Sequence, residues 1–66
     1  MSTIFIYPED FHKLRTAIIF KMNRDVDKIL NELGVHNVLK IKLTHDKIIC
    51  YTVNGEVHIK MRDIFD

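Results

Sequence analysis

The sequence has too few cysteines for a disulfide-stabilised domain. Cys50 is the only one, so no intrachain disulfide can form and a reducing, cytoplasmic location is the simpler expectation. None of the four histidines lies beside a cysteine pair or at the i, i+4 helical spacing common in structural zinc sites. We therefore expect no metal and no other cofactor.

Residues that catalytic motifs require are equally scarce. Two glycines cannot build a Gly-rich phosphate loop, and Ser2 is the only serine. No combination of Ser, His and Asp, or of Cys and His, suggests a nucleophile. The sequence therefore predicts a protein that is not an enzyme.

Long apolar runs and an excess of one charge are also missing. No stretch approaches the about 18 apolar residues of a membrane-spanning helix, and the N-terminus lacks the basic start of a signal peptide. The formal net charge of +1 gives no bulk attraction to nucleic acid or to a membrane. We expect no membrane partner, and nucleic-acid binding would need a local charge pattern.

The length predicts one small domain that spans residues 1–66. A single core of this size supplies only about 3–5 kcal/mol, and small chains supplement it with disulfides, metal or self-association. Because the first two are not expected here, self-association remains, and we expect a homodimer.

The first half of the chain predicts a strand and one long helix. Thr3–Tyr7 is rich in β-branched and aromatic residues, and Pro8 ends it and suits a first helical position. Apolar residues then recur at three- and four-residue steps, and Gly34 can cap the helix. The members of this stripe are Phe11, Leu14, Ile18, Met22, Val26, Ile29 and Leu33. The helix is expected from about Pro8 to Leu33.

One alternative stays open for the middle of this helix. Arg15 and Asp25 project onto or near the apolar stripe, and Phe20 points roughly opposite it. The same region is compatible with a strand near residues 16–22 and a helix that restarts with Asn23 as its N-cap.

The second half predicts a three-stranded antiparallel meander over about Val38–Thr44, Lys47–Val53 and Glu56–Arg62. Asn54-Gly55 lies between two alternating segments, which favours a hairpin with positive φ at both turn positions. His45-Asp46 provides a weaker turn one strand earlier.

Two-residue loops at both turns predict the register, with Leu39 opposite Thr52 and Tyr51 opposite His58. One face of the meander is then apolar, packs on the helix and contains Cys50, which we expect to be buried and unreactive. Its residues are Leu39, Ile41, Leu43, Ile48, Cys50, Thr52, Val57, Ile59 and Met61.

These elements together predict an α+β fold of the order β-α-β-β-β, with one long helix packed on one face of a three- to four-stranded sheet. The helix returns the chain once, so the first strand lies parallel to the second through a right-handed crossover. The sequence leaves open beside which outer strand the first strand lies.

The opposite face of the meander contains the candidate binding residues. Ile49, Tyr51 and Val53 follow its middle strand, where a solvated face normally alternates to polar residues. The charged and polar residues of this face are Lys40, Lys42, Lys47, Glu56, His58, Lys60 and Arg62. An exposed apolar patch with a charged rim is typical of an interaction site. We predict a protein-binding or regulatory module that acts through this face on a second copy or another protein.

Two further residues have competing interpretations. Phe20 adds a contact point on a continuous helix, or it packs beneath the first strand or the C-terminal tail. His58 could stack on Tyr51 or sense pH, but a half-exposed strand histidine is the favoured interpretation.

Nucleic-acid binding is the alternative function. The lysines could follow a phosphate backbone while Tyr51 stacks on a base. One aromatic side chain is few for this purpose, and strand lysines commonly protect sheet edges, so protein contact is favoured. Small size without catalytic residues is also typical of phage and mobile-element accessory proteins that dock onto a larger protein.

Overall fold

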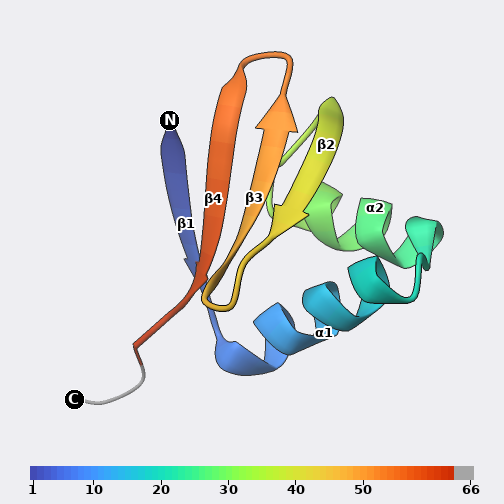
Figure 1. Cartoon of the computed structure of the whole chain (residues 1–66), viewed down its shortest axis with the longest axis vertical. Coiled ribbons are helices and arrows are strands. Elements are labelled where there is room, and N and C mark those ends of the chain that lie inside the picture. Colours follow the sequence, from blue (N-terminus) through green and yellow to red (C-terminus); the bar gives the residue numbers. More distant parts are fainter. Residues whose placement is uncertain (64–66) are drawn as a thin grey trace.

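A computed structural model describes residues 1–63, which form a compact α+β arrangement of two helices and a four-stranded mixed sheet (Figure 1). The elements are β1 (Ser2–Ile6), α1 (Pro8–Ile19), α2 (Asn23–Glu32), β2 (Val38–Leu43), β3 (Lys47–Thr52) and β4 (Gly55–Met61). The α+β class and the antiparallel meander are confirmed. Within the described residues, neither helix is long and apolar enough to cross a membrane.

The strand order in the sheet is β1-β4-β3-β2, with β1 parallel to β4 and the meander antiparallel. The first strand therefore lies beside the last one, with an unbroken register from Ser2 opposite Val57 to Ile6 opposite Met61. Both helices lie together on one side of the sheet (Figure 1). Neither helix of residues 1–63 lies over the other sheet face.

The core lies between the two helices and the covered sheet face. Phe11 and Leu14 of α1 are buried against Ile48, Cys50 and Ile59 of the central strands. The other buried members are Ile6, Ala17, Val26, Leu30 and Val35. Burial of such side chains is the main favourable contribution to folding.

The predicted single helix is wrong, because the chain reverses direction after Ile19. Lys21 adopts a φ of 55°, its amide donates to the carbonyl of Ile18 (3.2 Å), and the amide of Met22 donates to that of Ala17 (2.8 Å). These two bonds form a Schellman motif, which satisfies the last carbonyls of a helix and ends it. The strand near residues 16–22 is not formed either.

The restart of a helix at residue 23 is correct, although Asn23 is the first helical residue and Met22 occupies the N-cap position without a side-chain hydrogen bond. α2 ends in a second Schellman motif, and the predicted cap at Gly34 is confirmed. Gly34 has a φ of 79°, and the amide of Val35 donates to the carbonyl of Leu30 (2.8 Å).

Arg15 is close to the apolar stripe for a structural reason. Its Nη1 donates a hydrogen bond to the carbonyl of Thr44 (3.1 Å), which lies in the turn between β2 and β3. The guanidinium therefore attaches α1 to the turn between β2 and β3.

A β-bulge at the start of β2 corrects the predicted position of Leu39. Val38 lies opposite Thr52 and Lys40 opposite Tyr51, so Leu39 is the extra residue on its strand and is 72% exposed. Val38 takes the predicted place of Leu39 against the core. The pairs after the bulge follow the predicted register as far as the next turn.

The turn between β3 and β4 lies one residue earlier than predicted. Thr52 pairs with Gly55, so the loop is Val53-Asn54. Asn54 does not have a positive φ, whereas Gly55 has 118°. The hydroxyl of Thr52 donates to the carbonyl of Gly55 (2.8 Å) and accepts from the amide of Asn54 (3.1 Å). The residues of β3 and β4 keep their predicted faces but change partners, because moving the turn by one residue shifts the pairing by two positions, which is one full period of a strand.

Lys21 and Gly34 occupy equivalent positions in two Schellman motifs, and we expect opposite effects from exchanging their residue types. Lys21→Gly should raise the free energy of unfolding by about 1 kcal/mol, because a left-handed conformation costs a side-chain-bearing residue roughly 1–2 kcal/mol. Gly34→Ala should lower it by about 1 kcal/mol through the backbone alone, since an added Cβ meets no atom within 4 Å. Urea unfolding measures both, and equal effects of the same sign would contradict this account.

Cys50 has the buried environment predicted for it, and burial raises its pKa from 9.0 to about 11. We expect a thiol reagent at pH 8 to label the native protein at least about 100-fold more slowly than the denatured protein, since the thiolate population falls tenfold per pKa unit. The native state retains this proton where the unfolded state loses it, so the unfolding free energy should fall as pH rises from 9.0 to about 11. Cys50→Ala should remove that part of the fall.

Candidate binding face

The uncovered side of the sheet, here called the outer face, consists of side chains that alternate away from the helices on all four strands. Within the strands its residues are Thr3, Phe5, Lys40, Lys42, Lys47, Ile49, Tyr51, Glu56, His58 and Lys60. Continuation of the alternation adds Tyr7 after β1 and Arg62 after β4. All but one of the sequence-predicted binding residues lie on this face or at its end, and the exception is Phe20.

The middle of the outer face is a row of cross-strand neighbours: Thr3, His58, Ile49 and Lys42. Ile49 is only 7% exposed although no helix covers it, so its predicted exposure is wrong. Long lysine side chains can cover apolar atoms with their stems, and Lys42 is a direct neighbour. The centre of the face is therefore packed, and the accessible groups lie around it.

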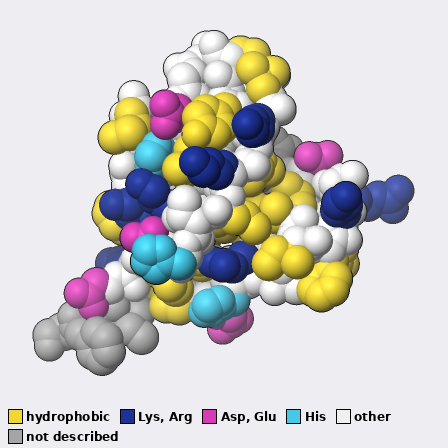
Figure 2. Space-filling model, in the orientation of Figure 1, with side chains coloured by type: hydrophobic (Ala, Val, Ile, Leu, Met, Phe, Trp, Pro, Cys, Tyr) yellow, Lys and Arg dark blue, Asp and Glu magenta, His cyan; other side chains and the backbone are white. Residues whose placement is uncertain are grey.

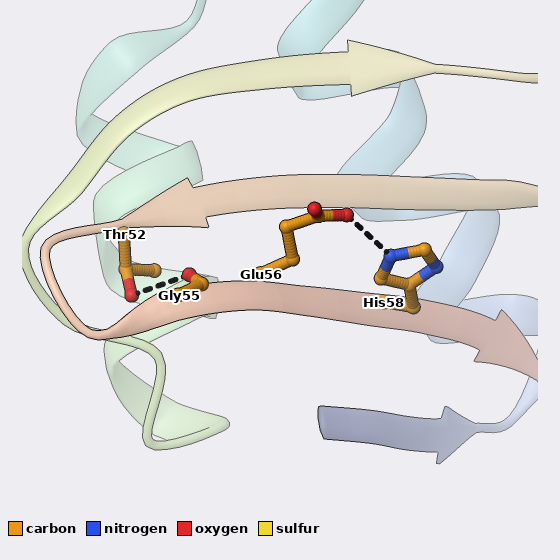
Figure 3. Close-up of polar contacts among 4 residues, drawn as sticks. All are labelled: Thr52, Gly55, Glu56 and His58. Atoms are coloured by element: carbon orange, nitrogen blue, oxygen red, sulfur yellow. Dashed lines mark hydrogen bonds and ion pairs between the residues drawn. The ribbon is translucent and has the colours of Figure 1, made fainter. Parts of the chain in front are cut away.

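His58 is more buried than predicted and has a different neighbour. It lies opposite Ile49 rather than Tyr51 and is 8% exposed. Its Nε2 is 3.0 Å from Oε1 of Glu56, which lies two residues earlier on the same face (Figure 3). Buried polar groups require such a partner, so this contact explains how a histidine is accommodated here.

The other two residues of the predicted apolar patch are separated. Tyr51 is half-buried and lies between Lys40 and Glu56 on the neighbouring strands. Val53 is exposed, but it belongs to the turn after β3. The three predicted residues therefore do not form one exposed apolar patch.

Two aromatic side chains at the β1 side were not among the predicted site residues. Phe5 is 59% exposed and lies opposite Lys60. Tyr7 is also exposed, and the guanidinium carbon of Arg62 lies 5.4 Å from the centre of its ring, within the range of a cation–π contact. The alternation of the first strand could have indicated that both share a face, but only its pairing with β4 places them beside these cations.

The charge of the outer face differs from that of the whole chain. Its positive side chains are Lys40, Lys42, Lys47, Lys60 and Arg62. With one negative side chain, Glu56, and with histidine counted as neutral, the face has a formal net charge of +4. The whole chain has +1, and the other residues within positions 1–63 have five positive and seven negative side chains, which gives them −2. Figure 2 shows Lys and Arg side chains spread over the sheet, with hydrophobic side chains exposed between them.

Phe20 lies away from the outer face, in the turn between α1 and α2. It is 72% exposed, and its neighbours Ile19 and Met22 are exposed as well. This turn is at the far end of the helices from β1 (Figure 1). Phe20 therefore neither packs beneath β1 nor extends the outer face.

The helices also border a shallow hollow of about 760 Å³. Its charged and titratable lining residues are Glu9, His12, Lys13, Asp25, Lys28 and Glu32. Both signs of charge are present, and no group of three or more His, Cys, Asp or Glu residues within positions 1–63 is arranged to hold a metal ion.

Comparison with known proteins gives no match: no family model, no curated protein and no solved structure is significantly similar to this chain.

The Glu56–His58 contact should stabilise the fold measurably. Glu56→Ala would leave the buried imidazole Nε2 without its carboxylate partner, and we expect a loss of about 1 kcal/mol in the free energy of unfolding at pH 7. Glu56→Gln retains an acceptor oxygen and should lose less. Urea unfolding of the three proteins checks this, and an unchanged stability of Glu56→Ala would show that water replaces the carboxylate at no cost.

Proposed function

We propose that this protein is a small, non-enzymatic binding module of the cytoplasm and that its outer face binds an acidic surface or segment of another protein. The single observation that carries the proposal is the separation of charge, with +4 on the helix-free face and −2 on the other residues of positions 1–63. Complementary charge increases the rate of association and selects the orientation of a partner.

Exposed apolar side chains around the outer face favour a protein as the partner. Phe5 is at the β1 side, Leu39 is at the bulge of β2, and Val53 is in the turn after β3. Apolar and aromatic contacts provide most of the affinity of protein interfaces, whereas charges at the rim mainly provide specificity. A partner that contacts only this face also avoids the negative charge of the rest of the molecule.

Single-stranded nucleic acid is a second candidate ligand, and the aromatic residues of the outer face are the observation that favours it. The sequence placed one aromatic residue, Tyr51, on this face, and the structure adds Phe5 and Tyr7. Phe5 and Tyr51 are separated by two strand spacings and four residue positions, or roughly 16 Å. Bases stacked on both rings would belong to nucleotides a few positions apart along one strand.

The location of the binding surface can be tested with two lysines of equal charge and different position. Lys42 is exposed on the outer face and Lys13 is exposed on α1. A 20-residue poly-L-glutamate should bind the wild type at low salt. Lys42→Gln should weaken binding roughly two- to fivefold, the range expected for loss of one exposed ionic contact, and Lys13→Gln should leave it unchanged. Fluorescence anisotropy measures both, and equal losses would show attraction without a defined face.

The two candidate ligands can be distinguished with an oligothymidylate of matched charge. We expect poly-L-glutamate to bind at least as tightly as the oligonucleotide. We also expect Tyr51→Leu to leave the affinity for poly-L-glutamate unchanged. Tighter binding of the oligonucleotide, together with weakening by Tyr51→Leu, would contradict the protein proposal and favour nucleic acid.

A further inference from the structure

Within residues 1–63, the outer edge of β1 lacks the usual protection against pairing with another strand. Its residues, Ser2–Ile6, include no charged side chain and no proline, and the ladder with β4 has no bulge. Native proteins normally block such edges with lysine, proline or a bulge, because an exposed row of backbone groups is a template for another strand.

The opposite edge of the same sheet provides an internal comparison. β2 has Lys40 and Lys42 along its length, and the bulge at Leu39 interrupts its regular geometry. Two of the usual protective devices are therefore present at one edge and absent from the other. Within residues 1–63, β1 is the only unprotected end of the sheet.

The backbone of β1 identifies which groups face this edge. The carbonyl of Ile6 accepts a hydrogen bond from the amide of Arg62, so it points toward β4. Backbone groups alternate in direction along a strand. Those of Ile4 therefore also point toward β4, and those of Thr3 and Phe5 point away from the sheet.

We propose that β1 pairs with β1 of a second copy of this chain, antiparallel, with the two-fold axis at Ile4. In this register Thr3 lies opposite Phe5 of the other copy, and each such pair exchanges both of its backbone hydrogen bonds. Thr3 and Phe5, whose backbone groups point away from β4, thus lie opposite each other across the two-fold axis. Such an isologous interface uses the same strand twice.

The alternation of backbone groups along β1 restricts the register of this pairing. Shifting the pairing by one residue would place the outward groups of Thr3 and Phe5 opposite groups that point away from them. The strand has no charge, so two copies meet without repulsion along it. Lys60 is the outer-face neighbour of Phe5, and Phe5 lies opposite Thr3 of the second copy. Lys60 is therefore in line with Thr3 and His58 of the second copy, and the two copies of Lys60 do not face each other.

Pairing in this register joins two sheets into one with eight strands and keeps both outer faces on the same side. The inference goes beyond the proposed binding function and does not depend on it. Strand pairing alone buries less area than a standard interface, so the dimer should be in concentration-dependent exchange, with a dissociation constant of roughly 1–100 μM.

Sedimentation velocity on matched edge variants tests the proposal. The wild type should change from monomer to dimer as its concentration rises through the micromolar range. Phe5→Lys places a charge beside its pairing partner and should raise the dissociation constant at least tenfold. Leu39→Lys adds the same charge at the β2 edge, where Leu39 is 72% exposed, and should have no effect. Circular dichroism confirms that both variants are folded.

Amide hydrogen exchange of the wild type gives a test that requires no variant. The amides of Ile4 and Ile6 should be protected at low and high protein concentration, because they face β4. The amides of Thr3 and Phe5 should become protected only at high concentration.

Three results would overturn the proposal. The first is a monomer at all concentrations up to about 1 mM, where even weak dimers form. The second is a dimer that Leu39→Lys dissociates and Phe5→Lys does not. The third is a dimer in which the protection of Thr3 and Phe5 does not change with concentration. None of these results affects the test with Lys42 and Lys13, so failure of the dimer and failure of the binding function are distinguishable.

Discussion

The parallel pairing of β1 with β4 is the interaction on which the rest of the structure depends. It brings the start of the chain to the last strand, so the segment between β1 and β2 has to cross one face of the sheet, and that segment forms the two helices. The opposite face is left uncovered as a result. The same pairing places Phe5 beside Lys60 and Tyr7 beside Arg62. The fold, the charged face and the free edge of β1 thus have one common origin.

The parts of the fold that could be predicted from the sequence are those determined by local periodicity. Alternation assigned the residues of β3 and β4 to the correct faces even though the turn at Gly55 was misplaced by one residue, because the resulting shift of two positions in the pairing equals the period of a strand. The features that could not be predicted depend on single backbone conformations. Lys21 takes the left-handed position that usually indicates glycine, and Leu39 is inserted in a bulge. No residue type in either place signals the change.

The candidate site was predictable in its location but not in its composition. The lysines of the meander share a face because of alternation alone. Exposure depends on neighbours from other strands, which is why Ile49 is buried where an accessible patch was expected. Phe5 joins the site only through its contact with β4, between residues far apart in the sequence. A whole-chain charge of +1 also conceals a face of +4.

The central position of β4 has a consequence for biosynthesis. During translation β1 leaves the ribosome long before β4, and neither of its edges has a partner in the meantime. The helices can form locally as they emerge, but the sheet cannot close until the final strand inserts between β1 and β3. A nascent or prematurely truncated chain therefore exposes an uncharged strand with two unpaired edges, the kind of feature that makes incompletely folded chains prone to aggregate.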